Sequence, residues 1–294
     1  AKIILLAGVM NTIELATAMQ YGFEPVVHCI EQVELLESCR GGTVDVWLKF
    51  DTGMNRLGFD PVDAPALIER ARRSRGVNEL RLMTHLASAD ELHGQATLRQ
   101  LDRFRPIMEG FDGDVSIANT PATLGWPAIA NARAEFGFNG DNWIRPGIAL
   151  FGISPFGDRT GEELGLKPVM QFEARLIATK PLRAGDRVGY KGAYTADSDT
   201  MLGIISAGYG DGYSRHFRSG TPVLINGRRV PVIGNVSMDM IAVDLGDDPA
   251  DQVGDIATLW GEGLPVEEVA PFADAIPYEL VCGVMNREES EIVG

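Results

Sequence analysis

The chain has 294 residues, of which 45% are hydrophobic and 23% charged, and a formal net charge of −15 at pH 7. This is enough apolar material for one large or two ordinary globular domains. The acidic excess argues against nucleic acid, and against an anionic membrane surface, as partners.

The first half of the chain alternates short apolar runs with helix-like segments. Strands are predicted at residues 3–6, 25–30, 44–50, 80–86, 115–119 and 143–150. Helices are predicted between them at residues 12–21, 32–39, 61–74, 95–108 and 121–130. This alternation predicts a parallel sheet with right-handed crossovers.

These six predicted β/α units are fewer than a closed TIM-type barrel needs. Either the sheet is open, or the sequence begins inside a barrel whose first units precede it. A strand is predicted at residue 3 with no lead-in, which favours the second interpretation.

From about residue 167 the predicted strands follow one another through short turns. They lie at residues 169–179, 187–194, 201–208, 222–225, 229–234, 238–245 and 255–260. A predicted helix at 266–274 precedes a last strand at 278–284, and Asn226-Gly227 is a strong hairpin signal. We therefore expect an α/β chain with a partial TIM-type β/α barrel at residues 1–166 and a mainly antiparallel β domain at 167–294.

Cysteines, histidines and apolar runs indicate the cellular compartment and whether a metal site or membrane span is expected. Cys29, Cys39 and Cys282 have no metal, redox or disulfide spacing, which fits a reducing cytosol. Cys29 and Cys282 lie in apolar runs and are predicted to be buried thiols. The four histidines are scattered, so no metal site is expected. Apolar runs of ~18 residues and a secretory leader pattern are both absent, so we expect a cytoplasmic protein without membrane spans.

Several polar residues fall at the carboxyl ends of predicted parallel strands, where α/β proteins bind ligands. Lys49 ends one strand and Arg56 lies in the loop after it, although this pair alone is better explained as a surface salt bridge. His85 ends another strand, where a core histidine and a catalytic one are equally plausible. Arg145 lies in an apolar stretch and requires a partner, because an unpaired buried charge is costly.

Two further positions suit an anionic ligand. Asn119 and Thr120 end a strand and open a helix, so they either cap that helix or form part of a phosphate cradle. Gly147 lets the backbone come close to a ligand because it has no side chain.

Seven motifs, in order, resemble those of the alanine racemases. They are WLKFDTGMNRLGF at 47–59, LMTHLASADE at 82–91, WIRPGIALFG at 143–152, VGY at 188–190, AGYGDGY at 207–213, VSMD at 236–239 and IPYEL at 276–280. The matches run through both predicted domains, so the resemblance is specific. It favours a functional role for Lys49 and Arg56 over the surface salt bridge.

The resemblance implies a fold-type III enzyme that uses pyridoxal phosphate to interconvert L- and D-alanine with two bases. It would supply D-alanine for peptidoglycan or serve alanine catabolism. A homodimer with shared active sites is implied, in which a Schiff-base lysine acts on one face of the substrate Cα and the partner subunit's Tyr190 on the other. His85 and Arg145 would assist that tyrosine, and Arg145 would disfavour protonation of the pyridine nitrogen.

The resemblance also implies the ligand contacts. Arg56 would hold the ring hydroxyl and the substrate carboxylate, and a carbamylated Lys49 would brace it. The phosphate would be held by Thr120 with the neighbouring Asn119, and by Gly147, Ile148 and Tyr278. Substrate-side contacts would come from Tyr209, Met238 and Asp239.

The sequence departs from the family in three places. A segment like VKANAYGHG, which carries the Schiff-base lysine, is absent from the 294 residues. Lys191 follows Tyr190 where the family usually has glycine. The run MNREE at 285–289 stands where an arginine–valine–proline run is usual.

Four alternative functions remain open on the sequence alone. They are a broad-specificity amino-acid racemase, a pyridoxal-phosphate decarboxylase of the same fold, a catalytically inactive fragment, and a non-enzymatic protein that binds pyridoxal phosphate. Arg145 counts against the decarboxylase, because such enzymes usually offer another group to the pyridine nitrogen. The predicted β domain counts against the non-enzymatic protein, since those are barrels without a second domain.

Overall fold

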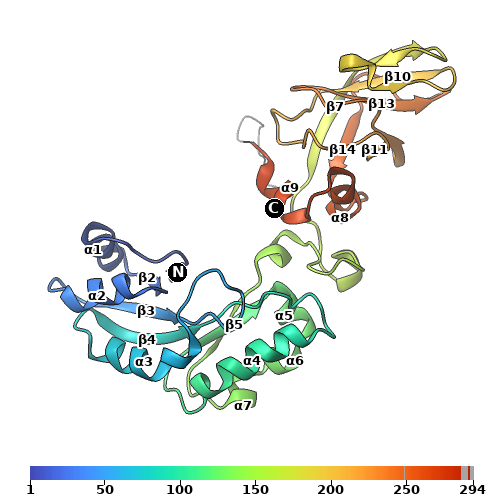
Figure 1. Cartoon of the computed structure of the whole chain (residues 1–294). Coiled ribbons are helices and arrows are strands. Elements are labelled where there is room, and N and C mark those ends of the chain that lie inside the picture. The colour runs from blue at the N-terminus through green and yellow to red at the C-terminus, as the bar shows by residue number, and fades with distance from the viewer. Residues whose placement is uncertain (248, 286–290, 292–294) are drawn as a thin grey trace. The chain divides into compact units, whose positions relative to one another are not determined.

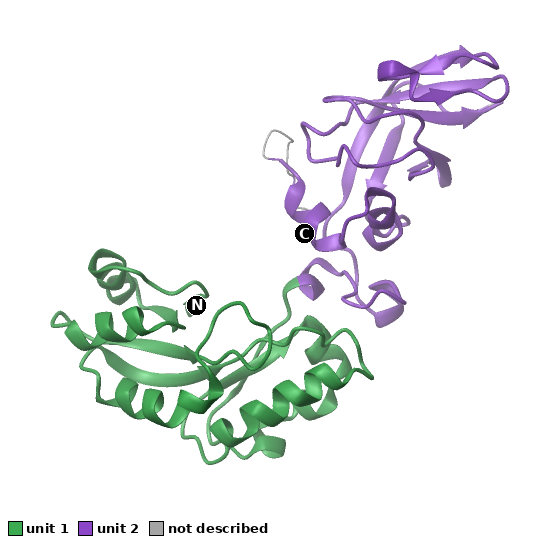
Figure 2. Cartoon of the chain, in the orientation of Figure 1, with its two compact units in different colours: residues 1–147 green, residues 148–294 purple. Residues whose placement is uncertain are grey.

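The computed structural model describes residues 1–247, 249–285 and 291 (Figure 1). It divides into two compact units, Ala1–Gly147 and Ile148–Gly294 (Figure 2). The boundary predicted after residue 166 lies beyond this division, at the end of a stretch with two short 3₁₀ helices, η2 (Gly147–Phe151) and η3 (Glu162–Leu164). Residues 286–289 of the MNREE run lie outside the described part.

Unit 1 contains a six-stranded sheet in which every neighbouring pair is parallel, as predicted. In spatial order the strands are β1 (Ile3–Leu5), β2 (Phe23–Val27), β3 (Val44–Lys49), β4 (Val77–Met83), β5 (Val115–Asn119) and β6 (Asn142–Arg145). Among the described residues β1 and β6 are the edges. The sheet is therefore an open arc, as a partial barrel requires.

Helices connect these strands, and Figure 1 shows α3 and α4 along the outer side of the curved sheet. They are α1 (Thr12–Tyr21), α2 (Ile30–Ser38), η1 (Pro61–Asp63), α3 (Ala64–Arg73), α4 (Gln95–Met108), α5 (Thr120–Gly125), α6 (Pro127–Ala130) and α7 (Ala132–Phe136). Local signals set their ends: Asn11 Oδ1 accepts hydrogen bonds from the amides of Ile13 and Glu14, and Gly22 ends α1 with φ 66°.

The two faces of the sheet carry different layers. On β3, Val46 belongs to the large core that strands and helices share. The next residue, Trp47, belongs to a separate cluster, because successive side chains of a strand point to opposite faces. This second cluster lines the inner side of the arc and comprises Ile4, Val26, Trp47, Met83 and Trp143.

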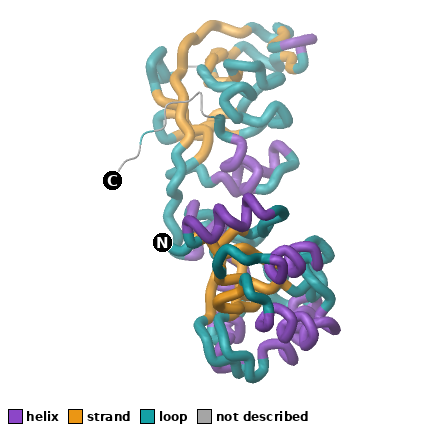
Figure 3. The backbone as a smooth tube through the Cα atoms, turned by 90° about the vertical axis from the view of Figure 1, so that its left-hand side faces the viewer, coloured by secondary structure: helices purple, strands orange, loops and turns teal. Residues whose placement is uncertain are grey.

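Unit 2 is an antiparallel β structure, as predicted, and Figure 3 shows strands and loops dominating it. Its main sheet has the order β12-β11-β14-β7-β10-β13, and a bridge between Val232 and Val243 joins the two ends into a barrel-like form. The elements are β7 (Phe172–Leu182), β8 (Arg187–Val188), η4 (Tyr190–Gly192), β9 (Tyr194–Thr195), β10 (Thr200–Ile205), β11 (Pro222–Ile225), β12 (Arg228–Pro231), β13 (Ile241–Gly246), β14 (Ile256–Trp260), α8 (Val266–Val269), η5 (Ala270–Ala273) and α9 (Pro277–Gly283). The hairpin predicted at Asn226-Gly227 is confirmed, with φ 48° and 79°.

Two predicted strands are too long. The strand predicted at 143–150 ends at Arg145, because Pro146 has no N–H for the ladder, and η2 follows. The strand predicted at 187–194 consists of β8 and β9 with the turn η4 between them. Tyr190 therefore lies on a turn rather than on a strand.

The strand predicted at 278–284 is wrong, because that segment forms α9. A short apolar run does not distinguish strand from helix, and Pro277 in the first helical turn supplies the start. The rotation of the helix exposes Cys282, which was predicted to be buried, and Cys29 is only half-buried at the start of α2.

Candidate active site

Three basic side chains and one histidine come from the carboxyl edge of the unit 1 sheet. Lys49 ends β3, His85 follows β4, and Arg145 ends β6. Each lies two residues after a member of the inner cluster, so these residues share the inner side of the arc. Arg56 lies in the loop after β3.

Arg145 is fixed by neutral partners. Its Nη2 donates to the carbonyl oxygen of Thr84 at 2.7 Å, and its Nη1 hydrogen bonds to Ser116 Oγ. Nη2 also lies 3.4 Å from Nδ1 of His85. Among the described residues no carboxylate pairs with Arg145, so its charge is uncompensated. Burial lowers its pKa to about 10, and it stays protonated at neutral pH.

His85 is neutral at physiological pH. Burial, together with the charges of Arg145, Arg56 and Lys49, lowers its pKa to about 4. Because Arg145 can only donate, Nδ1 of the neutral ring accepts and Nε2 carries the proton. The sequence left a core histidine and a functional one equally plausible, and this arrangement favours the functional one.

Lys49 is an unusual lysine. It is only 7% exposed, and no described residue forms a hydrogen bond or ion pair with its ammonium group. Burial lowers its pKa, and the charges of Arg56 and Arg145 lower it further, against the opposing effect of Asp51. A larger fraction of Lys49 is therefore the neutral, nucleophilic amine.

Asp51 shapes the loop that carries Arg56. Its carboxylate accepts hydrogen bonds from the amides of Gly53, Asn55 and Arg56, each at 2.9 Å. Burial alone would raise the pKa of Asp51, but these amides lower it below its usual range. The carboxylate is therefore engaged by the backbone, while the Arg56 side chain is exposed.

A buried polar group supports this edge, and the sequence analysis missed it. Thr52 Oγ1 lies 2.9 Å from Thr84 Oγ1, and Gln100 Nε2 donates to Thr52 Oγ1 at 3.1 Å and to the His85 carbonyl oxygen at 3.0 Å. All three side chains of this group, Thr52, Thr84 and Gln100, are at most 4% exposed. A glutamine at an apolar position of a helix is the one signal that could have revealed it.

The predicted phosphate residues of unit 1 lie beside one another. Asn119 caps α5 by accepting from the Ala122 amide at 3.2 Å and donates to the Leu86 carbonyl oxygen at 3.3 Å, so its side chain is engaged structurally. Thr120 is 2% exposed. A Cβ added at Gly147 would meet only the Thr120 hydroxyl, at 3.9 Å, which leaves open space there.

The remaining predicted residues lie in unit 2, and three of them share a hollow of about 390 Å³. Tyr190, Met238 and Asp239 line it, with Arg187 at its wall. The strand predicted from residue 238 begins only at Ile241, so Met238 and Asp239 lie on a turn. Tyr190 is 73% exposed.

The turn carrying Tyr209 is bonded to the same wall. The Tyr209 amide donates to the Ser237 carbonyl oxygen at 3.0 Å, and the Gly210 amide donates to that of Met238 at 2.8 Å. Tyr278 lies in the first turn of α9 and is 40% exposed, whereas Ile148 is buried in the unit 2 core, so only its backbone is available to a ligand.

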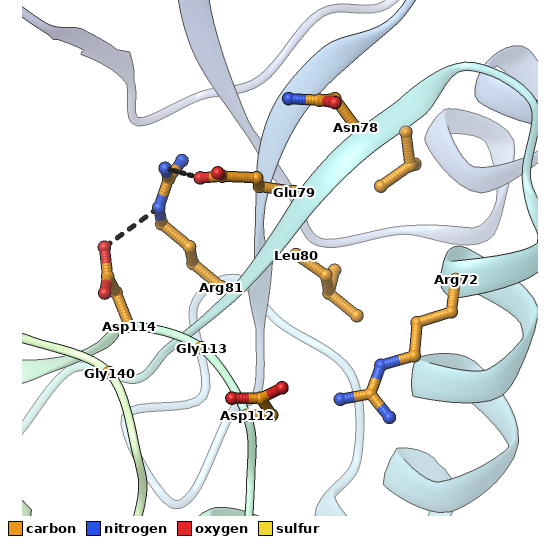
Figure 4. A pocket seen from close by; sticks show the side chains of 10 residues that line it. Arg72, Asn78, Glu79, Leu80, Arg81, Asp112, Gly113, Asp114 and Gly140 are labelled. Carbon is orange, nitrogen blue, oxygen red and sulfur yellow. Dashed lines mark hydrogen bonds and ion pairs between the residues drawn. The ribbon is translucent and has the colours of Figure 1, made fainter.

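A separate hollow, about 420 Å³ in volume, lies in unit 1 at the amino-terminal edge of the sheet (Figure 4). Its centre is the buried Arg81, which pairs with Glu24 at 3.0 Å, Asp45 at 3.2 Å and Asp114 at 3.1 Å, and also with Glu79. These charges belong to neighbouring strands and tie the bottom of the arc together. None of the predicted site residues lines this hollow.

Candidate metal-ligand groups and membrane-spanning helices are both absent from the described part of the chain. Its His, Cys, Asp and Glu side chains form no group of three or more that could hold a metal ion. Every helix there is too short or too polar to span a membrane.

Comparison with known proteins identifies both units. Residues 1–155 match the family model "Alanine racemase, N-terminal domain", and residues 169–292 match "Alanine racemase, C-terminal domain". Alanine racemases of Shewanella loihica and Vibrio vulnificus are 46% and 44% identical to the chain, covering 98% of it and 78% of their own length. 

Solved structures agree with these matches. The biosynthetic alanine racemase of Pseudomonas aeruginosa has a TM-score of 0.89 at 42% identity, over 98% of the chain and 78% of that structure. The alanine racemase of Bartonella henselae, solved with covalently bound pyridoxal phosphate, has a TM-score of 0.82 at 28% identity, over 98% of the chain and 77% of that structure.

A β/α barrel arc with a cation-rich carboxyl edge, joined to an antiparallel β domain, defines the fold-type III class of pyridoxal-phosphate enzymes. Within that class the chain belongs to the alanine racemase family and is an isomerase.

Proposed function

We propose that this chain interconverts L- and D-alanine by a two-base mechanism at the carboxyl edge of the unit 1 sheet. The observation that carries the proposal is the charge of that edge. The charges of Lys49, Arg56 and Arg145 act on a neutral His85, and the carboxylate that opposes them at Lys49, Asp51, is engaged by backbone amides. Such an excess of positive charge suits a ligand with phosphate and carboxylate groups.

The residues present therefore fit pyridoxal phosphate. Thr120, the amide groups around Gly147, and Tyr278 would hold the phosphate, and Arg145 would face the pyridine nitrogen. When bound, the cofactor acidifies the substrate Cα–H. Arg56 would orient the substrate carboxylate, and the permanent charge of Arg145 would keep a proton off the ring nitrogen, which limits competing reactions.

Tyr190 is proposed as the base on one face of Cα. A phenol has a reference pKa of about 10, so it needs a neighbour that stabilises its charge. Neutral His85 supplies an N–H at Nε2, and Arg145 fixes the ring through Nδ1. The two together are suited to relay a proton to and from the phenol.

We further propose a cytoplasmic homodimer, in which the partner subunit's Tyr190 completes the site on unit 1. Two-fold pairing of this kind creates two equivalent shared sites. Met238, Asp239 and Tyr209 would line the substrate side, since they share a wall with Tyr190 in unit 2.

Mixed dimers test this proposal. A Tyr190→Phe holoenzyme and an Arg56→Ala holoenzyme should each be nearly inactive. After subunit exchange, one site of each mixed dimer has an intact unit 1 edge and an intact tyrosine, so activity should return. If mass spectrometry shows heterodimers and no activity returns, the shared site is wrong. A fully active Tyr190→Phe enzyme would contradict its role as a base.

A further inference from the structure

The turn that carries Tyr190 has a strained backbone. Gly189, Lys191 and Gly192 have φ values of 76°, 61° and 58°, and the Gly192 amide donates to the Gly189 carbonyl oxygen at 3.0 Å. The left-handed conformation costs a residue with a side chain about 1–2 kcal/mol. Lys191 therefore does not favour this turn by itself, and something else must hold it.

Arg187 supplies that hold from the strand before the turn. Its Nη2 donates to the carbonyl oxygens of both Lys191, at 2.7 Å, and Gly192, at 3.0 Å. The guanidinium also occupies the space over Gly192: a Cβ added there would lie 2.3 Å from Nε and 2.7 Å from Cζ of Arg187. Position 192 therefore requires glycine for two reasons: its φ is positive, and the Arg187 guanidinium occupies the space of a side chain.

The Tyr190 side chain depends on this turn for its position. It is 73% exposed, and among the described residues its hydroxyl forms no hydrogen bond. The place of the phenol is therefore set by the backbone from Gly189 to Gly192. Misplacing a reacting group by about 1 Å can reduce a rate by roughly 100-fold.

We propose that Arg187 is a positioning residue that holds the Tyr190 turn in its productive conformation. This inference rests on the proposed role of Tyr190 as a base. Arg187 acts through two main-chain carbonyl groups and does not itself touch the substrate. Nη2 donates both hydrogen bonds while Nε and Cζ lie over Gly192, so the planar guanidinium covers the turn as well as bonding to it. A lysine ammonium on a flexible stem does not reproduce that plane.

Backbone exchange provides the first test, and it needs no cofactor. Hydrogen–deuterium exchange of a peptide covering 187–195 should accelerate at least about fivefold in Arg187→Ala. Arg187→Lys should behave similarly, because it keeps the charge and loses the guanidinium plane that lies over Gly192. Arg183→Ala is the matched control: Arg183 is also exposed and pairs with Asp199 near the other end of this segment. Unchanged exchange in Arg187→Ala would overturn the clamp.

Proton transfer provides the second test. In the holoenzyme, loss of the α-hydrogen of each alanine enantiomer to solvent is followed separately by NMR in deuterated water. Arg187→Ala should slow exchange from the enantiomer that faces Tyr190 roughly 10- to 100-fold, with little change in the other enantiomer or in KM. Equal slowing of both enantiomers, or full rescue by Arg187→Lys, would contradict a positioning role.

Gly192→Ala tests the same contact from the glycine, because the added methyl group would displace the Arg187 guanidinium. If both changes act on one clamp, the double variant Arg187→Ala/Gly192→Ala should be no slower than Gly192→Ala alone. Additive losses would mean separate effects and would overturn the inference. Tyr190→Phe separates the two proposals. If this variant exchanges the α-hydrogen of both enantiomers at the wild-type rate, the proposed base is wrong. If Tyr190→Phe loses exchange from one enantiomer and Arg187→Ala exchanges both at the wild-type rate, only the clamp is refuted.

Discussion

Nη2 of Arg145 lies 3.4 Å from Nδ1 of His85 and 2.7 Å from the carbonyl oxygen of Thr84, the residue just before the histidine. One guanidinium thus fixes both the backbone and the ring of the same strand end. The contact also determines the tautomer, since an arginine donor leaves the histidine proton on Nε2. Arg145 therefore has two effects on His85: its charge lowers the pKa of the ring, and its hydrogen bond to Nδ1 leaves the N–H on Nε2.

The first prediction concerns His85 and pH. Its folded-state pKa of about 4 lies below the ordinary value of 6.5, so between these values the unfolded chain binds a proton that the folded chain does not. Stability should therefore fall as the pH falls from 6.5 to 4. His85→Gln should make the unfolding free energy depend less steeply on pH. One proton gives at most ~1.4 kcal/mol per pH unit, and the half-buried ring should account for a fraction of that slope.

Urea unfolding of the wild-type chain and His85→Gln at several pH values measures this effect. His93→Gln is the matched control, because His93 lies outside the Arg145 contacts. An NMR titration that placed the pKa of His85 at 6.5 or above would contradict both the tautomer and the pH dependence.

The second prediction concerns Lys49. Its lowered pKa increases the neutral amine that carbon dioxide requires, and a carbamate would place an anion among Arg56 and Arg145. Lys49→Ala should therefore reduce kcat roughly 10- to 100-fold, and small carboxylates such as acetate should restore part of it. Mass spectrometry at raised bicarbonate should show a labile addition on wild-type protein that the variant lacks. Full activity of Lys49→Ala without added carboxylate would exclude the bracing role.

The residues at the strand ends were predictable from sequence, but the side chains that hydrogen bond to them were not. Lys49 and Arg145 end apolar strands and His85 follows one, and parallel strands bring their carboxyl ends to one edge. Ser116, which bonds to Arg145, is one polar residue within an apolar strand, and its role depends on a neighbour 29 residues away. Such cross-strand pairing follows from register, which local patterns do not specify.

The turn at Tyr190 was mistaken for a strand for a related reason. From Arg187 to Lys191, the apolar Val188 and Tyr190 alternate with charged or small residues as they would in a strand. The positive φ of Lys191 breaks that pattern, and a lysine gives no sign of it. The family's usual glycine at this position is explained by the observed backbone, since glycine adopts it without steric cost.

The third prediction follows from that backbone. Lys191→Gly removes a left-handed lysine but gives the unfolded chain more freedom, so the net gain in unfolding free energy should be ~0–1 kcal/mol. Lys191→Ala separates charge from backbone, because it keeps the strained φ and loses the ammonium group. The urea midpoint of unit 2 should rise in the glycine variant and not in the alanine variant. A decrease in the glycine variant would mean that the lysine side chain stabilises the turn.

The last prediction concerns Arg81, which is 3% exposed among carboxylates of β2, β3 and β4 and of Asp114, the residue just before β5. Arg81→Met should lower the unfolding free energy of unit 1 by ~3–5 kcal/mol, because the buried carboxylate of Glu24 loses its buried counter-charge and keeps an ion pair with the exposed Lys2.

Arg229→Met is the control for that change. Arg229 pairs with Glu268 at 2.7 Å, but both side chains are more than a third exposed, so the loss there should stay below ~1 kcal/mol. Thermal unfolding of both variants at pH 7.5 measures the difference. If Arg81→Met were as stable as wild type, the Arg81 pairs would not hold the bottom of the arc. The site proposed above lies at the opposite ends of the same strands, so activity at permissive temperature should change little in either variant.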